Sequence, residues 1–370
     1  MEGKFLLTVA AALLLFISNS MAGELKAFSV KAVPPEYLHA IGASLNEELE
    51  CCDSRFPSAT TNKRKNTKPA YRLETLFSSQ QGSWMFQSFV NNGLFKVASS
   101  YQPSHPKALM VTKGFADLEW LHRTVNDSSI ITKEGDKYRL SYPLIIGKNA
   151  TLLINDKLEL NSASGTALIN LGTLILDKAV VVGSVAAGKQ SKGSFRPFIT
   201  SWNGSETYIY HAELSDLGYD AHLSHGLSII KHVGLAGVSG ESAWVEVVNS
   251  RFNRMEAGLT VNGAKGIISK NHIDGSRQYG INVNNSSLKI EQNIIKNTAL
   301  NSGIHLQNPY RTIIKKNKIE RSKKAGISVA GRVGVLKVVG NQLLTNHGSG
   351  MLIEATDTSD NGYIQVLGNI

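Results

Sequence analysis

The sequence YGINVNN at residues 279–285 alternates apolar and polar side chains, a pattern typical of a β-strand with one exposed face. Asn282 and Asn284 are the exposed residues of this expected strand, and Asn285 follows them. Their amides donate and accept hydrogen bonds and can hold sugar hydroxyls, but an amide does not take up a proton near neutral pH. The stretch therefore predicts either the floor of an active site or a surface that only binds.

A second strand of the same kind, GIHLQ at 303–307, brings a histidine into the same neighbourhood. Histidine changes its charge near neutral pH, so His305 is the candidate base. If neighbouring strands stack in register, His305 lies about 5 Å beyond Asn282. A lone histidine on a sheet face is often only a solvated residue, and both interpretations stay open.

An internal repeat predicts this stacking. A glycine followed by an apolar–x–apolar strand recurs at intervals of 22, 23, 23 and 24 residues, at Gly258, Gly280, Gly303, Gly326 and Gly350. An asparagine stands nine or ten residues before each glycine, at Asn249, Asn271, Asn293, Asn317 and Asn341. Self-similarity at this period indicates a stacked solenoid. We expect an all-β fold, a right-handed parallel β-helix of 22–24 residues per coil, with the asparagines hydrogen-bonded in an internal ladder.

The strand period predicts which side chains share a face. The first and third residues after each glycine should point inward, and the second and fourth outward. One exposed face should then carry the side chains of Thr260, Asn262, Asn282, Asn284, His305, Gln307, Ser328 and Ala330. A groove that hydrogen-bonds sugar hydroxyls has this composition, although any solvated sheet can share it.

Positive charge points to an anionic ligand. The formal net charge is +10, and PYRTIIKKNKIERSKK at 309–324 holds many basic residues against the single acid Glu320. The basic residues are Arg311, Lys315, Lys316, Lys318, Arg321, Lys323 and Lys324. We expect an acidic polysaccharide as partner. Nucleic acid is an improbable partner, because the amino terminus predicts export.

The first 22 residues resemble a secretory signal. Lys4 precedes an apolar run from Phe5 to Ile17, which is too short for a membrane span and ends in small residues. We therefore expect a periplasmic protein with a less regular extension at 23–112 and the β-helix at 113–370. Within the extension, 54–72 reads as a basic linker, and the short apolar piece YRLETLF at 71–77 as a helix packed on the main body.

Neither a metal site nor a cofactor is expected. Cys51 and Cys52 are adjacent and cannot build a disulfide framework or a cysteine-based metal site. The sequence stops at GYIQVLGNI, an apolar–Gly–Asn segment that normally begins another coil. A chain shortened at this end, or an end covered by another subunit, would explain this ending.

The segment SFRPFITSWNGSETYIYHAELSDLGYD at 194–220 resembles the periplasmic mannuronan C5-epimerases of alginate biosynthesis. The likeness extends from about residue 113 to the end and includes PLIIGKNATLLI and the glycine-started coils. It implies a β-helix that binds polymannuronate and inverts C5 of residues within the polymer. In this family the base is a histidine in an Asp-Pro-His-Asp motif after Tyr-Gly-Ile, and an arginine one coil later neutralises the substrate carboxylate.

This sequence departs from the family at both positions. Asn284 stands where the base is expected, and Asn308 stands where the arginine is expected. His305 could substitute as the base, and Tyr310 or Arg311 could supply an acid or a cation. The residues expected to contact substrate are Thr260, Asn262, Asn282, Asn285, Gln307, Lys315 and Lys316.

Two hypotheses follow. The chain is either a uronate-polymer C5-epimerase with altered residues, or a silent β-helix that binds an anionic exopolysaccharide and assists its export, in contact with the export machinery. Calcium-dependent lyases and glycoside hydrolases are less favoured, because the predicted strand faces lack the carboxylate clusters that they need.

Overall fold

The computed structural model describes residues 52–55, 67–76, 89, 91–102, 105–184, 194–231 and 240–370, except for the side chains of 357–361. All of these residues belong to one compact unit, Leu49–Ile370. The expected signal segment at 1–22 and most of the expected basic linker lie outside them. No helix in the described ranges combines the length and apolar character needed to cross a bilayer.

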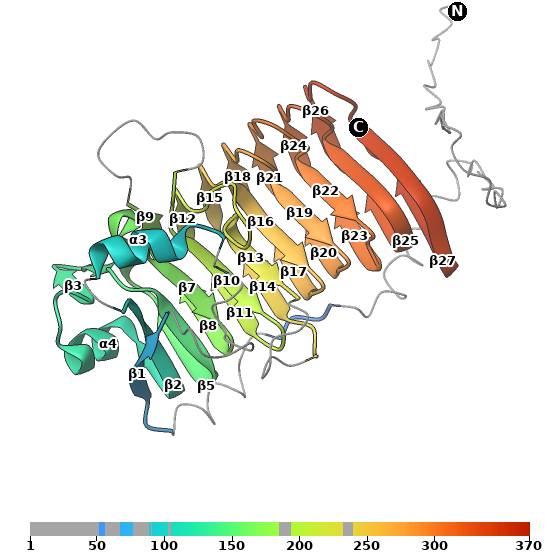
Figure 1. The fold of residues 1–370 in the computed structure, drawn as a ribbon. Coiled ribbons are helices and arrows are strands. Elements are labelled where there is room, and N and C mark those ends of the chain that lie inside the picture. The colour runs from blue at the N-terminus through green and yellow to red at the C-terminus, as the bar shows by residue number, and fades with distance from the viewer. Residues whose placement is uncertain are drawn as a thin grey trace, which may run out of the picture. The chain divides into compact units, whose positions relative to one another are not determined.

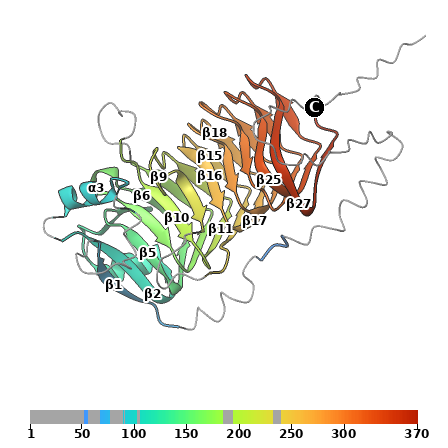
Figure 2. The same ribbon diagram turned by 45° about the vertical axis from the view of Figure 1, so that its right-hand side comes forward.

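The described chain forms a parallel β-helix in which successive coils stack along one axis (Figures 1 and 2). We call its three stacks of strands columns 1, 2 and 3, in the order in which each coil passes through them. Column 1 contains β7 (Ala167–Asn170), β10 (Phe198–Trp202), β13 (Gly226–Ile230), β16 (Ala257–Asn262), β19 (Ile281–Asn284) and β22 (Ile304–Gln307). Column 2 contains β8 (Thr173–Asp177), β11 (Glu206–Tyr210), β14 (Trp244–Val248), β17 (Lys265–Ser269), β20 (Ser287–Glu291) and β23 (Arg311–Lys315).

Column 3 forms a separate sheet. Its parallel strands are β4 (Lys137–Leu140), β6 (Lys157–Leu160), β9 (Val180–Gly183), β12 (Glu213–Ser215), β15 (Arg251–Asn253), β18 (His272–Asp274), β21 (Ile294–Lys296), β24 (Lys318–Glu320) and β26 (Gln342–Leu344), with β3 (Ile131–Glu134) antiparallel at its edge. Four long strands bend around the corner from column 1 to column 2: β2 (Lys107–Asp117), β5 (Leu144–Ile154), β25 (Ile327–Val339) and β27 (Met351–Leu367).

The coil array begins earlier than the sequence predicts. β2 pairs in parallel with β5 from Leu109 onward, so the boundary expected at residue 113 falls inside a strand. The helix expected at 71–77 is wrong: residues 70–75 form β1 (Ala70–Thr75), which pairs antiparallel with β2. The same strand takes up the last residues of the expected linker. Hydrogen bonds to an existing sheet edge outweigh local helical preference here.

The predicted inward and outward alternation is confirmed. Leu259, Ile281, Ile304 and Ile327 are fully buried in one continuous core and lie opposite one another in consecutive coils. The repeated glycine that precedes them sits where the backbone leaves no room. A Cβ built on Gly280 would lie 2.4 Å from a methyl carbon of Ile295 and 2.5 Å from the carbonyl oxygen of Gly303. The glycine repeat is thus a packing requirement at the entry to column 1.

An asparagine ladder lies at the corner between columns 2 and 3. Asn271 donates to Oδ1 of Asn293 at 3.0 Å, Asn293 to Asn317 at 2.9 Å, and Asn317 to Asn341 at 2.9 Å. Asn341 continues the ladder to Asn369 at 2.8 Å. The ladder is confirmed for these residues, which satisfy buried backbone groups as well as one another.

Asn249 is the exception to the predicted ladder. It lies one position earlier, in the left-handed turn conformation (φ 52°), and Ser250 takes the ladder position by donating its backbone N–H to Asn271. The residues that correspond to Asn249 in later coils, including Lys270 and Gln292, share this positive φ. Asparagine tolerates that conformation better than most residues, so backbone geometry accounts for its presence there.

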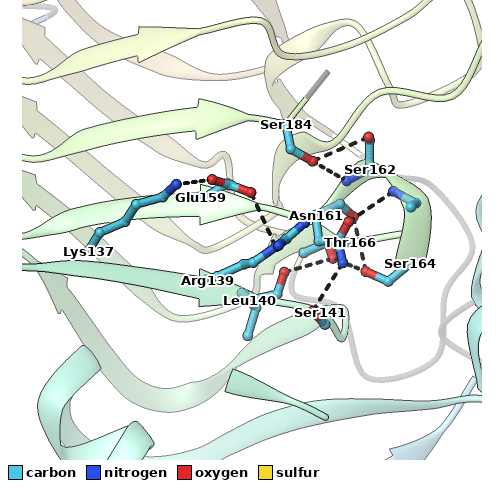
Figure 3. A network of polar contacts seen from close by, with 11 residues as sticks. Lys137, Arg139, Leu140, Ser141, Glu159, Asn161, Ser162, Ser164, Thr166 and Ser184 are labelled. Atoms are coloured by element: carbon cyan, nitrogen blue, oxygen red, sulfur yellow. Dashed lines mark hydrogen bonds and ion pairs between the residues drawn. The ribbon is translucent and has the colours of Figure 1, made fainter. Parts of the chain in front are cut away.

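The first coils close the corner after column 3 with a different network (Figure 3). Asn161 donates to Ser141 Oγ at 3.2 Å and caps the short helix η3 (Ser162–Ser164) by accepting from Ala163 N at 3.1 Å. On the adjacent column-3 strands, Glu159 forms ion pairs with Lys137 and Arg139. The ladder is therefore a feature of the later, more regular coils.

Two α-helices flank the first coils. α3 (Leu94–Tyr101) buries Leu94 and Ala98 against the outward side of column 1. α4 (Leu118–Val125) follows β2 directly, and the carboxylate of Asp117 caps it by accepting from Trp120 N at 2.7 Å. α3 therefore covers one end of the face on which the candidate site lies.

The ladder generates a stability prediction. Replacing Asn293 with Ala leaves the backbone N–H of Asn271 and the carbonyl of Ile268 without partners in the core, which we expect to cost about 2–4 kcal/mol of unfolding free energy. Asn301→Ala is the matched control, since it removes one part-buried contact to Gln278 and should cost less than about 1 kcal/mol. Urea denaturation followed by circular dichroism measures both. Equal losses in the two variants would contradict the ladder's role.

Candidate functional site

The outward side of column 1 changes character along the axis. In the first coils it is apolar: Phe89 and α3 pack on Ile145, Ile169 and the aromatic residues Phe198 and Trp202. Phe89 stacks on Trp202 with ring centroids 5.6 Å apart. The FRPF…SW…LGY segment noted in the sequence belongs largely to this cluster, because Phe195 and Tyr219 also pack there, 5.2 Å apart. The segment's aromatic residues are therefore packing residues.

Beyond this cluster the same side becomes a polar face, defined by Ser228, Thr260, Asn262, Asn282, Asn284, His305, Gln307 and Ser328. The predicted register is confirmed. Thr260 pairs with Asn282, Asn282 with His305, and His305 with Ser328. Asn284 lies between Asn262 and Gln307 on the neighbouring strands. Stacking thus makes one row of residues that are 22 or 23 apart in sequence.

Several buried polar atoms along this row have no hydrogen-bond partner within the described structure. They are Thr200 Oγ1, Ser228 Oγ, Thr260 Oγ1 and Asn282 Oδ1, which occupy successive strands of column 1. A buried polar group without a partner costs about 1–3 kcal/mol. A ligand rich in hydroxyl groups could supply the missing partners, so this row is suited to a saccharide.

His305 has the contacts of an oriented base. Its Nδ1 lies 2.9 Å from Ser328 Oγ, and its ring stacks on Tyr279 with centroids 5.2 Å apart at 24°. Burial lowers the pKa of His305 below 6.5, and the positive charge of Lys324 lowers it further. The imidazole is therefore neutral at pH 7. With Nδ1 occupied by Ser328, the other ring nitrogen is the one available to accept a proton.

Tyr279 is a site residue that the sequence argument missed. It lies in the turn before β19, and burial raises the pKa of its phenol above 10. The phenol keeps its proton at neutral pH and can donate a hydrogen bond beside the imidazole. The Tyr-Gly-Ile signature contained it, but only the stacking of two coils brings it onto His305.

Asn285 and Asn308 form a second, more exposed ladder at the corner between columns 1 and 2. Asn285 donates to Asn262 at 3.4 Å, and Asn308 donates to Asn285 at 3.3 Å. Both residues have positive φ, 48° and 50°. Gly263 and Gly331 hold the corresponding corners with φ of 67° and 77°. Glycine and asparagine suit such corners, so Asn308 has a backbone role where the family resemblance leads one to expect an arginine.

The basic cluster of 309–324 is spread around the coil and does not border the polar face as a group. Arg311 and Lys315 lie on column 2, and Lys316 lies in the turn after it. Lys318 and Arg321 contact Glu320 on column 3. Tyr310 is 61% exposed at the corner between columns 1 and 2. The expectation of a basic flank is corrected because a 22–24-residue coil carries one short segment past every face.

Other chemistry finds little support in the described residues. They contain no group of three or more His, Cys, Asp and Glu side chains that could hold a metal ion. Acidic side chains are absent from the polar face as defined above. The arrangement offers one neutral imidazole, one phenol, several amides and hydroxyls, and the charge of Lys324 nearby.

The causes of the His305 shift can be separated. Lys324→Gln removes the positive charge that disfavours the imidazolium, so the pKa of His305 should rise but remain below 6.5, because burial is the larger cause. NMR titration of the imidazole ring protons measures this, with Lys318→Gln on column 3 as the control that should leave the pKa unchanged. No rise in the Lys324 variant would argue against the contact.

Comparisons with known proteins agree with this fold. The family model described as "Right handed beta helix region" matches residues 202–365. The crystal structure of the periplasmic alginate epimerase AlgG aligns with 90% of this chain and 78% of its own, at a TM-score of 0.68 and 18% identity. A mutant form of the same epimerase aligns with 93% of this chain and 85% of its own, at a TM-score of 0.67 and 17% identity. The right-handed parallel β-helix expected from the sequence is confirmed.

Sequence relatives point the same way. The mannuronan C5-epimerase of Pseudomonas putida (strain KT2440) is 28% identical over 277 residues, which are 70% of this chain and 53% of that protein. The Pseudomonas syringae pv. tomato enzyme is 25% identical over 68% of this chain and 50% of its own length. This chain spans about half the length of these curated relatives. It belongs to the right-handed parallel β-helix proteins that are related to the mannuronan C5-epimerases.

Proposed function

We propose that the chain binds an acidic polysaccharide along the polar face and inverts C5 of uronate residues within it, with His305 as the base. The observation that carries this proposal is the contact set of His305, a neutral imidazole held by Ser328 and stacked on Tyr279. The relatives named as mannuronan C5-epimerases support polymannuronate as the substrate. The related periplasmic epimerase supports a periplasmic location.

The proposed chemistry begins with the substrate carboxylate. The proton on C5 becomes acidic only when the adjacent carboxylate is neutralised or strongly hydrogen-bonded. Lys324, whose charge acts on His305, supplies a cation in this proposal, and the amides of Asn282 and Gln307 supply donors on adjacent strands. These groups take over the part that the family assigns to an arginine.

The proton transfer is then balanced as follows. The free nitrogen of His305 removes the C5 proton, and the electron pair of that bond delocalises into the neutralised carboxylate. A water molecule returns a proton to C5 from the opposite face, which inverts the centre. His305 then releases its proton to the resulting hydroxide. Ser328 fixes the tautomer of the imidazole, and the phenol of Tyr279 supports the ring.

A second candidate is a non-catalytic polysaccharide-binding protein. It is favoured by Asn284 and Asn308, because amides occupy the positions that correspond to the family's base and arginine. The unpartnered hydroxyls of Ser228 and Thr260 would serve binding equally well without catalysis. Association with an export machinery stays a prediction from the sequence in either case.

Polymannuronate incubated with the protein in deuterated water separates the two candidates by proton NMR. We expect guluronate signals and deuterium at C5, and a loss of rate of at least about 100-fold in His305→Gln, because a positioned base contributes about that much or more. His347→Gln, which changes an exposed turn histidine, is the matched control and should retain full activity. Binding without deuterium incorporation would favour the second candidate.

The pH dependence follows from the pKa of His305. The base must be neutral to act, and its pKa lies below 6.5, so kcat/KM should stay level around neutral pH and fall only as the pH drops below that pKa. Lys324→Gln should move this acidic limb to higher pH. A limb that stays above pH 6.5 in the wild type would contradict His305 as the base.

A further inference from the structure

The outward side of column 2 carries a second surface in the same coils as the polar face. Its basic residues, which define the cationic face, are Lys265, Lys289, Arg311 and Lys315 on strands and Lys270 and Lys316 in the turns that follow. Glu291 lies among them and contacts Lys289 at 3.2 Å. Lys265, Arg311 and Lys315 contact no acidic side chain within the described structure. Positive charge is thus concentrated on column 2.

The strand register spaces these charges regularly. Ser287 lies between Lys265 and Arg311, so the latter two are two strand spacings apart, about 10 Å. Lys315 pairs directly with Glu291, and Gln292 lies between Lys270 and Lys316. A linear polymer with one carboxylate per sugar presents negative charge at similarly regular intervals. The face therefore suits a repeating polyanion better than a compact anion.

The two faces divide the groups that such a polymer needs. The polar face offers amides and hydroxyls, and the cation that acts on His305 is Lys324. It is suited to hydroxyl recognition, but one lysine does little to attract a chain of carboxylates. The cationic face supplies the charge that the polar face lacks.

The faces meet at a short corner. Column 1 ends at Gln307 in β22, and column 2 begins at Arg311 in β23. Between them, Tyr310 is 61% exposed, with its ring available for packing against a sugar. A polymer leaving the neighbourhood of His305 could therefore cross Tyr310 and reach Arg311 and Lys315 within the same coil.

We propose that the cationic face is a second binding track for the same acidic polysaccharide, holding the stretch of polymer next to the one that lies on the polar face. This inference rests on the proposed ligand class but not on catalysis. It also gives Arg311, Lys315 and Lys316 a role different from the one expected at first, since they would anchor the polymer at a distance from the reacting sugar.

The test compares two triple variants of the full-length protein. Arg311→Gln/Lys315→Gln/Lys316→Gln removes three charges from the cationic face, and Gln292 shows that glutamine is accepted at the turn position of Lys316. Lys296→Gln/Lys318→Gln/Arg321→Gln removes the same charge from column 3, where all three residues contact Glu320. Calorimetric titration with long polymannuronate and with a mannuronate trisaccharide measures the binding.

We expect the first variant to bind the long polymer at least about tenfold more weakly at low salt, with a shallower salt dependence, because fewer counterions are released. Its affinity for the trisaccharide should stay within about twofold of the wild type. The column 3 variant should bind both ligands as the wild type does. Loss of trisaccharide binding in the first variant would instead place these residues in the reacting subsite and overturn the inference.

The remaining outcomes separate this inference from the proposed function. If the wild type binds neither ligand, the proposed function fails and the inference fails with it. If the first variant binds long polymer as tightly as the wild type, the inference alone fails. Binding to phosphatidylglycerol vesicles that is lost in the first variant, with polymer affinity unchanged, would assign the face to an anionic membrane surface and would also overturn the inference.

Discussion

The register of parallel strands from coil to coil is the constraint on which the structure depends. Because side chains alternate along a strand, a slip of one residue would turn the core residues outward and the polar face inward. Two features hold the register. Gly280 and its counterparts leave no space for a side chain where column 1 begins, and the ladder from Asn271 to Asn369 joins each coil to the next at the opposite corner.

A fixed register gives each column a different surface. Column 3 carries ion pairs within the protein, such as Glu320 with Lys318 and Arg321. Column 1 carries the amides, the hydroxyls and the imidazole, and column 2 carries cations that contact few acids in the described structure. Each coil contributes a few residues to every column, so a short segment of sequence cannot form a patch by itself. Patches arise between coils, from residues that are 22–24 positions apart.

The two departures from the epimerase pattern have different physical settings. Asn308 lies at a left-handed corner, where Asn285 precedes it and Gly331 follows it in adjacent coils, so an asparagine there serves the backbone. Asn284 lies on a strand with ordinary geometry, between Asn262 and Gln307. Its identity is therefore a choice of side chain. His305, one strand along, is neutral and oriented, which keeps acid–base chemistry possible on this face.

The sequence by itself determined the coil period, the inward and outward alternation and the row from Thr260 to Ser328, because all three are written in a repeat of fixed length. It also predicted His305 as the candidate base and the family relationship. Only the tertiary structure decided that Asn249 is a turn residue, that Tyr279 stacks on His305, and that the basic segment 309–324 divides among three faces. Periodicity predicts which face a residue takes along a strand, but corner geometry, side-chain burial and contacts between coils depend on how the coils stack.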